Sequence, residues 1–257
     1  MKQVSASTIC NTELMPGYHL LCVEAPDIAS EAQPGQFVTV RCGPDLILRR
    51  PLSIHRVDNS YQLSILFAVV GKGTRWLSQR QKNEKIDLLG PLGNGFHIEK
   101  ASRDLLLVAG GTGIAPLVFL AQQALKQGKS VKLLLGARTK EGLYPRERLP
   151  DGLEIADTTE DGSSGVKGMV SGILPDYIDQ ADQVYACGPE AMYQTIASQM
   201  QQQHTKKSVQ ISLEVRMGCG LGACFGCSIK TKHGMKKVCL DGPVFNLDEV
   251  LWQEVKI

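Results

Sequence analysis

Short apolar stretches alternate with turn residues through the first part of the chain, up to about residue 98. The candidate strands cover 36–42, 49–57, 61–70 and 85–93, and glycine, proline, asparagine or aspartate residues lie between them. This spacing of short strands and turns is typical of a small antiparallel barrel. The sequence therefore predicts a β-barrel domain over residues 1–98.

The hydrophobic pattern changes at about residue 103. An apolar strand at 104–111 ends in glycines, and residues 116–128 have helical spacing, with Pro116 in the first turn and Gly128 at the end. Further strands at 130–138 and 182–189 and a helix at 190–203 follow. Strands that alternate with helices form a parallel sheet, so we predict an α/β nucleotide-binding domain over 99–205.

The last region, 206–257, opens with a stretch that alternates cleanly between apolar and polar residues. Val209, Ile211, Leu213 and Val215 would share one face of a strand at 208–217. A loop rich in cysteine and glycine follows directly, "MGCGLGACFGC" at 217–227. We predict a small third domain here, which completes an α/β plus β fold.

Composition narrows the class of protein. The chain has 257 residues, a net charge of +2 and eight cysteines. It has no stretch close to the ~20 apolar residues that span a bilayer and no apolar signal-peptide core, so we expect a cytoplasmic protein that binds neither membrane nor nucleic acid. In a reducing compartment, cysteines serve as metal ligands or buried thiols rather than disulfides. We interpret Cys10, Cys22 and Cys42 as packing residues.

Four cysteines have the spacing of a metal centre. Cys219, Cys224 and Cys227 follow C-x4-C-x2-C, and Cys239 comes after eleven further residues. The first three match plant-type [2Fe–2S] spacing, whereas a zinc ribbon more often has two C-x2-C pairs. The glycines of the loop would let the backbone wrap a cluster and donate amide hydrogen bonds to its sulfurs. Structural zinc remains the alternative.

A glycine-rich turn lies between the strand at 104–111 and the helix that follows. It brings backbone amides to a helix N-terminus, where phosphate binds, although Pro116 stands where the last glycine of G-x-G-x-x-G would be. A second turn, "CGP" at 187–189, would line the same crevice at the carboxyl ends of the strands. The predicted nucleotide-binding residues are Gly110, Gly111, Thr112, Gly113, Pro116, Cys187, Gly188 and Pro189.

The barrel carries a second candidate ligand site. "RRPLSI" at 49–54 lies on a predicted strand, and the planar guanidinium of Arg50 suits a diphosphate. "GKGT" at 71–74 offers further backbone amides before a short helix. Arg50 and Ser53 lie out of phase along the strand and would serve different parts of one long ligand.

With these motifs in order, the first two regions resemble the ferredoxin–NADP reductase superfamily. The superfamily's arginine-x-aromatic-serine motif appears here as Arg50-Pro51-Leu52-Ser53, with leucine in place of the aromatic residue that stacks on the flavin. Together with "TEDGSSGVKG" at 159–168, "CGPEAM" and the cysteine region, the whole length is similar to the electron transfer subunits of class B dihydroorotate dehydrogenases.

The resemblance implies FAD, a [2Fe–2S] cluster on the four cysteines, and NAD. It also implies an FMN-containing catalytic partner that oxidises dihydroorotate in pyrimidine biosynthesis, in a heterotetramer of two of each subunit. No catalytic residue beyond the cofactors is expected, and Ser53 would lie near flavin N5. Arg138 could pair with a 2′-phosphate, so the choice between NAD and NADP stays open. The implied FAD residues are Arg50, Pro51, Leu52, Ser53, Phe67, Ala68, Val69, Gly73 and Thr74.

Two alternatives remain at this point. The same order of barrel, nucleotide domain and cluster occurs in NAD(P)H-linked subunits of hydrogenases, sulfite reductases and transhydrogenases. A binding module with structural zinc would be no enzyme at all. Separately, lysines and one arginine between Lys206 and Lys237 form a basic run that could face the partner.

Overall fold

The computed structural model describes residues 1–202 and 207–254. The predicted helix at 190–203 ends at Gln202, and Gln203 and Lys206 lie outside the described residues. The strands are β1 Lys2–Met15, β2 Tyr18–Glu24, β3 Phe37–Val40, β4 Arg50–Asn59, β5 Gln62–Ala68, β6 Lys85–Leu92, β7 Asp104–Gly110, β8 Ser130–Ala137, β9 Glu154–Thr159, β10 Val166–Lys167, β11 Gln183–Cys187, β12 Val209–Ser212, β13 Ser228–Thr231, β14 Gly234–Lys237 and β15 Val244–Asn246. The helices are α1 Pro26–Ala29, α2 Lys72–Ser78, α3 Ile114–Lys126, α4 Val170–Ile173, α5 Pro175–Ile178, α6 Glu190–Gln202 and α7 Val238–Asp241, with 3₁₀ turns at Gly111–Gly113, Lys140–Gly142, Arg146–Arg148 and Leu247–Glu249.

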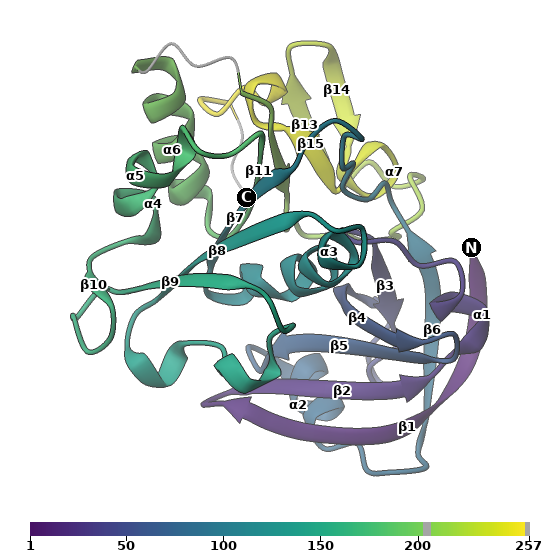
Figure 1. The fold of residues 1–257 in the computed structure, drawn as a ribbon. Helices are drawn as coiled ribbons and strands as arrows, with labels where there is room; N and C mark the ends of the chain where they lie inside the picture. Colours follow the sequence, from purple (N-terminus) through teal and green to yellow (C-terminus); the bar gives the residue numbers. More distant parts are fainter. Residues whose placement is uncertain (203–206, 255–257) are drawn as a thin grey trace.

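The predicted antiparallel barrel is confirmed, with six strands in the closed order β1-β2-β5-β4-β3-β6 (Figure 1). The long hairpin β1–β2 has no counterpart among the strands expected from the sequence. The β1 stretch, "KQVSASTICNTELM", is mostly polar and few of its side chains are buried, so its hydrophobic signal is weak. It forms a strand because β2 and β6 pair with it on either side, which closes the barrel and leaves no open edge.

The predicted α/β sheet is also confirmed. Its order is β10-β9-β8-β7-β11-β12-β15, and every pair is parallel except β12–β15. Side chains of β7 alternate between its faces. Leu105 and Leu107 pack in a cluster with α3, whereas Leu106 and Val108 pack in a cluster with α4, α5 and α6. Helices therefore cover both faces, which explains the continuous apolar run of this strand.

The expected strand at 208–217 is too long. β12 stops at Ser212, and the Leu213 amide then donates to the Pro243 carbonyl oxygen at 2.9 Å. The chain leaves the sheet here and runs on as an irregular linker to the cysteine loop. Because β12 and β15 extend the seven-stranded sheet, the last region shares a layer with the nucleotide region. The division at 98 and 205 stays a prediction.

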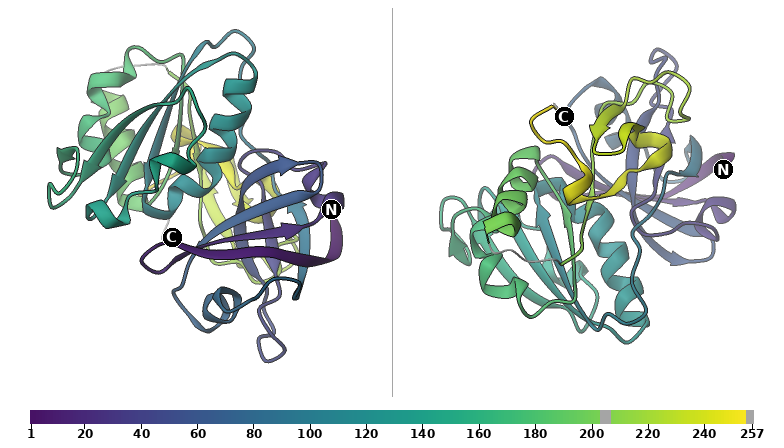
Figure 2. Two further views of the ribbon diagram at one scale, coloured as in Figure 1. Left: turned by 60° about the horizontal axis from the view of Figure 1, so that its bottom comes forward. Right: turned by 90° about the horizontal axis from the view of Figure 1, so that it is seen from above.

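The C-terminal segment packs against both the barrel and the α/β sheet (Figure 2). Asn94, just after the barrel, forms a β-bridge with Pro243, and its side chain donates to the carbonyl oxygens of Leu240 and Asp241. One buried cluster contains the barrel residues Phe37 and Leu92 together with residues of α7. The cysteine region is thus anchored to the barrel as well as to the sheet. No helix among residues 1–202 and 207–254 is long and apolar enough to cross a membrane.

His55 of β4 joins the barrel to the α/β layer. Its ring is fully buried, with Nδ1 2.8 Å from the Ala115 carbonyl oxygen in α3 and Nε2 3.0 Å from the Tyr144 hydroxyl. Since a carbonyl only accepts, Nδ1 carries the proton and Nε2 accepts from the tyrosine. Burial lowers the pKa of His55 from 6.5 to about 4. The sequence assigned no role to this histidine, because its partners lie 60 and 89 residues away.

We predict that this histidine makes stability depend on pH. On acidification the unfolded chain takes up the proton before the folded one, so the free energy of unfolding falls as the pH drops from 6.5 towards about 4. The contribution lost between pH 6.5 and pH 5 is about 2 kcal/mol. Urea unfolding of His55→Gln should show a flatter pH dependence than the wild type, while His233→Gln, at an exposed position, should not. An equally steep dependence in His55→Gln would contradict the assignment.

Candidate functional site

A cavity of about 690 Å³ opens where the barrel, the α/β layer and the linker after β12 meet. All the residues predicted to bind FAD line it except Val69 and Gly73, and Thr112 of the predicted nucleotide site lines it too. The sequence did not identify the other residues of its wall. These are Phe37, Leu48, Arg49, Leu66, Val70, Ala115, Leu213, Glu214, Val215, Arg216, Met217 and Pro243.

The two arginines at the start of β4 differ in their partners. Arg49 forms an ion pair with Asp87 at 2.7 Å. Arg50 donates to the Leu48 carbonyl oxygen at 2.8 Å, and no carboxylate among the described residues forms an ion pair with it. A Cβ on Gly73 would lie 3.0 Å from Nε of Arg50, so the glycine lets this side chain lie across α2. The half-buried guanidinium of Arg50 is therefore available to an anion.

Thr74 orders the turn before α2. Its hydroxyl oxygen accepts from the amides of Val70 and Gly71 at 2.9 and 3.2 Å. Val70 is 86% exposed at the cavity rim, whereas Phe67 is buried in the barrel core and stacks on His19. The "GKGT" motif thus shapes the wall through a side chain that caps its own turn. The helix begins at Lys72, inside the motif, whereas the sequence placed the whole motif before it.

The linker 213–217 forms the third wall of the cavity and leads directly to Cys219. Glu214 is exposed to the cavity but surrounded by protein on its other sides, and this burial raises the pKa of its carboxyl. A signal for this wall was present in the sequence, because only Gly218 separates the alternating stretch at 208–217 from the first cysteine. What the sequence could not show is that these residues fold back over the barrel strands.

The two predicted phosphate-binding turns meet at the centre of the sheet. β7 and β11 are parallel neighbours. The next three strands in the chain, β8 to β10, lie on one side of β7, and β11 and β12 lie on the other. Ligands of open α/β sheets bind at such a switch point. A Cβ on Gly113 would lie 1.8 Å from the Cys187 carbonyl oxygen, and one on Gly110 would lie 2.9 Å from Cδ of Pro189. Only glycine allows this approach.

Some of the residues predicted to bind the nucleotide are accessible to solvent and others are buried. Gly111, with φ of +54°, and Pro189 are exposed, and Thr112 is half-buried. Pro116 is buried as the third residue of α3, which begins at Ile114. The Cys187 thiol is also fully buried and donates to the Ser212 carbonyl oxygen at 3.5 Å. Any contact of Cys187 with a nucleotide would therefore come from its backbone.

The four cysteines lie in the loop 218–227 and on α7, and backbone amides donate to three of their sulfurs. Sγ of Cys219 accepts from Leu221 and Cys224 at 3.3 and 3.5 Å, and Sγ of Cys239 accepts from Gly222 at 3.1 Å. Sγ of Cys227 accepts from the amide of Cys239 at 3.5 Å. The amide of Leu221 is the main cause that lowers the pKa of Cys219 to about 6, whereas burial raises that of Cys239 to about 12.

This arrangement fits a [2Fe–2S] cluster. Four thiols supply its ligands, and amides that donate to sulfur stabilise thiolate charge. Among the described residues, no three His, Cys, Asp or Glu side chains gather closely enough to hold a single ion. Of the four glycines expected to wrap the loop, Gly220 and Gly222 have positive φ, at +71° and +79°. A Cβ on Gly220 would lie 2.8 Å from Thr39 of β3, so the loop needs this glycine to approach the barrel.

Comparisons with known families and structures agree with this geometry. Residues 214–251 match the iron–sulfur cluster binding domain of dihydroorotate dehydrogenase B, and residues 107–198 match the oxidoreductase NAD-binding domain. A solved structure of an NADH-dependent reduced ferredoxin–NADP oxidoreductase covers 97% of this chain and 91% of its own, with a TM-score of 0.87 and 29% identity. A ferredoxin NADP⁺ reductase from Neisseria gonorrhoeae, at 16% identity over 79% of this chain and 92% of its own, has a TM-score of 0.66 and shares the fold.

Curated relatives extend over almost the full length. A protein of Desulforamulus reducens is 39% identical over 98% of this chain and 99% of its own, and one of Geobacillus kaustophilus is 42% identical over 85% and 87%. Both are named dihydroorotate dehydrogenase B (NAD(+)), electron transfer subunit. The resemblance seen in the sequence is confirmed, and the match to an iron–sulfur domain argues against the zinc alternative. The chain belongs to the family of electron transfer subunits of dihydroorotate dehydrogenase B.

Proposed function

We propose that this chain carries FAD and a [2Fe–2S] cluster and passes electrons from the FMN of a dihydroorotate-oxidising partner to NAD⁺ in pyrimidine biosynthesis, in the cytoplasm. The proposal is supported mainly by one observation: residues next to the cluster site and to the nucleotide site line the same cavity as the predicted FAD residues. The linker 213–217 lines the cavity on the barrel and continues into Cys219, and Thr112 of the phosphate-binding turn lines the same cavity. Three sites for three redox groups therefore adjoin one another within one chain.

The cavity is where we place the flavin. Arg50 would bind the diphosphate, Ser53 and the backbone of β5 would face the ring system, and Leu52 would pack against it without aromatic stacking. The crevice beside Gly111 and Pro189 would hold the nicotinamide nucleotide. A flavin takes part in both one- and two-electron steps, so it can connect a one-electron cluster with a two-electron nicotinamide. The residues of the chain would bind and orient these groups.

We propose that the partner docks on the surface around the cysteine loop, in a heterotetramer of two of each subunit. Cys224 is exposed there, and four large apolar side chains of the C-terminal region are between 45% and 66% exposed: Leu221, Phe225, Met235 and Leu240. The basic run is partly paired within the chain. Lys230, Lys232 and Lys236 each form an ion pair within the chain, and Lys237 donates to the Gly222 carbonyl oxygen.

A second candidate function rests on the ferredoxin–NADP oxidoreductase structure, which matches this chain over nearly its full length. A subunit of that type would use the same three sites with a different partner. Purifying the tagged chain with its natural partner separates the two. A second flavoprotein with dihydroorotate-dependent NAD⁺ reduction supports the proposal, and a different partner without that activity contradicts it.

Arg50→Ala should weaken FAD binding. Removing a guanidinium that binds a diphosphate costs about 2 kcal/mol, or about thirtyfold in affinity. We would measure the dissociation constant of FAD by flavin fluorescence on the purified complex. Arg103→Ala, at an exposed position before β7, is the matched control. Unchanged FAD affinity in Arg50→Ala would show that the diphosphate lies elsewhere.

Cys224→Ser should interrupt electron transfer to the partner without affecting the flavin. FAD should remain bound and NADH should still reduce it, because the nucleotide crevice is intact. Dihydroorotate-dependent NAD⁺ reduction should fall about a hundredfold or more, and the visible absorbance of the cluster should be lost. Cys10→Ser, outside the loop, should retain both the dihydroorotate-dependent NAD⁺ reduction and the cluster absorbance. Coupled activity that survives in Cys224→Ser would rule out the cluster as the route.

Phe225→Asp should weaken the complex with the partner by about tenfold or more, since a buried aromatic anchor often dominates an interface. Val166→Asp, at a similarly exposed valine on β10, is the control for adding a charge to an apolar surface position. Affinity would be measured by biolayer interferometry on protein with an unchanged cluster absorbance. Equal affinities of the two variants would place the partner on another face.

A further inference from the structure

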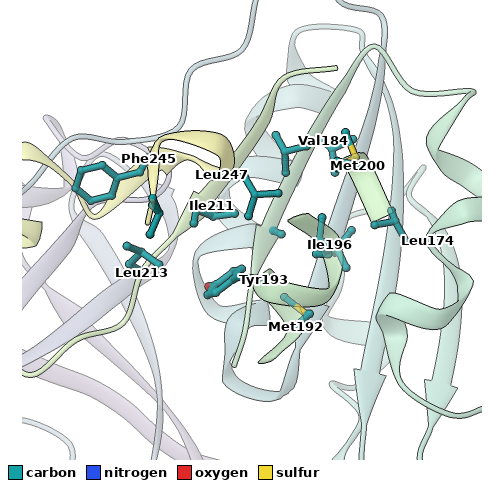
Figure 3. Packing of buried hydrophobic residues seen from close by; sticks show 14 of the residues in the cluster. Leu174, Val184, Met192, Tyr193, Ile196, Met200, Ile211, Leu213, Phe245 and Leu247 are labelled. Atoms are coloured by element: carbon teal, nitrogen blue, oxygen red, sulfur yellow. The ribbon is translucent and has the colours of Figure 1, made fainter. Parts of the chain in front are cut away.

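A buried phenol connects the nucleotide crevice with the wall of the flavin cavity. Tyr193 of α6 is 1% exposed, and its hydroxyl accepts from the Gly188 amide at 2.9 Å. The same hydroxyl donates to the Ser212 carbonyl oxygen at 2.7 Å. Figure 3 shows Tyr193 between α6 and the segment that carries Ile211 and Leu213. One side chain thus bridges two backbone segments that no ladder hydrogen bond joins at this point.

At one end of the bridge, Tyr193 holds a peptide plane of the "CGP" turn. The carbonyl oxygen of this plane belongs to Cys187 and lies where a Cβ on Gly113 would be, and its amide belongs to Gly188 and points to the phenol. The plane is therefore held between the turn before α3 and Tyr193. Its orientation sets the direction in which the chain continues to Gly188 and Pro189, at the mouth of the crevice.

At the other end, Tyr193 holds the point where the chain leaves the sheet. Ser212 is the last residue of β12, and the linker 213–217 that follows forms the cavity wall and leads to Cys219. The Ser212 carbonyl oxygen also accepts from the Cys187 thiol. The end of β11 and the start of the linker are therefore connected through one carbonyl group.

Packing holds the ring of Tyr193 in place, and its hydroxyl stays protonated. The ring stacks on Trp252 with centroids 5.5 Å apart, and the indole donates to the Leu247 carbonyl oxygen. Burial raises the pKa of Tyr193 well above its ordinary value, so the hydroxyl keeps the proton that it donates to Ser212. As both donor and acceptor, the phenol joins the two backbone segments.

We propose that Tyr193 is a positioning residue that holds the nicotinamide crevice and the linker wall of the flavin cavity in the relative geometry needed for hydride transfer. The proposal rests on the proposed function, because it concerns the placing of flavin against nicotinamide. Hydride transfer depends steeply on the distance and alignment of its reactants, so a small rotation of either peptide lowers the rate. The chain contributes this geometry without contacting either reacting atom through Tyr193.

Tyr193→Phe tests the proposal, since it keeps the stacked ring and removes both hydrogen bonds. The matched control is Tyr185→Phe on β11, another fully buried tyrosine, whose hydroxyl donates to the His97 carbonyl oxygen and lies 2.9 Å from Oε1 of Gln183. Three quantities would be measured on the complex with its partner: the limiting rate of FAD reduction by NADH, the dissociation constant of NAD⁺, and amide hydrogen exchange.

In Tyr193→Phe we expect the limiting rate to fall about tenfold and NAD⁺ to bind about threefold more weakly. Peptides that cover residues 186–190 and 211–217 should exchange faster together, because the bridge joins them. Tyr185→Phe should change none of these three quantities, even if both variants lose similar thermal stability. Equal values for the two variants would overturn the proposal, as would faster exchange at only one of the two segments.

If Tyr193→Phe does not fold, Trp252→Leu removes the stacking partner and leaves the hydroxyl, and it should show the same coupled exchange to a smaller degree. Exchange confined to the C-terminus in that variant would contradict the bridge. Wild-type protein that NADH does not reduce would contradict the proposed function instead, and the exchange pattern alone then decides whether Tyr193 joins the two segments.

Discussion

The rest of the structure depends on the contacts that the start of α3 makes with the turn after β11 and with the barrel. Gly113 approaches the Cys187 carbonyl oxygen so closely that no side chain fits between them. Two residues later the Ala115 carbonyl oxygen accepts from His55 of the barrel. The strand that begins at Arg50 and the turn at the end of β11 are therefore held to the same few backbone atoms, and the positions of the flavin cavity and the nucleotide crevice are fixed relative to each other.

The need to fix these positions explains why polar side chains are buried between layers that could have packed through apolar groups alone. An apolar interface is tolerant of small sliding movements, whereas a hydrogen bond has a narrow range of distance and direction. His55 and Tyr193 each connect segments far apart in the sequence through both a donated and an accepted bond. Redox groups that exchange electrons and hydride need such fixed distances more than they need additional stability.

The cysteine region is not an independent appendage. Its two flanking strands extend the central sheet, its loop approaches β3 through Gly220, and a shared buried cluster joins α7 to the barrel. The cluster ligands are consequently held by the same framework as the other two sites. The exposed apolar side chains of this region lie on its surface, where Cys224 is also exposed, whereas Cys227 and Cys239 are buried in the framework.

The sequence by itself determined the local features. The spacing of the cysteines, the glycines after β7, the "RRPLSI" strand and the order of barrel and α/β regions follow from residue types a few positions apart, and the structure and the family confirm the architecture that they predicted. The tertiary structure alone decided which of these residues meet. It made β1 a barrel strand despite its polar pattern, ended β12 at Ser212 and folded the linker 213–217 over the cavity. It also buried Pro116 and the Cys187 thiol, and it gave His55 and Tyr193 their partners. The reason is physical: periodicity and spacing record interactions within one element, whereas a hydrogen bond between elements leaves no pattern in the sequence near either partner.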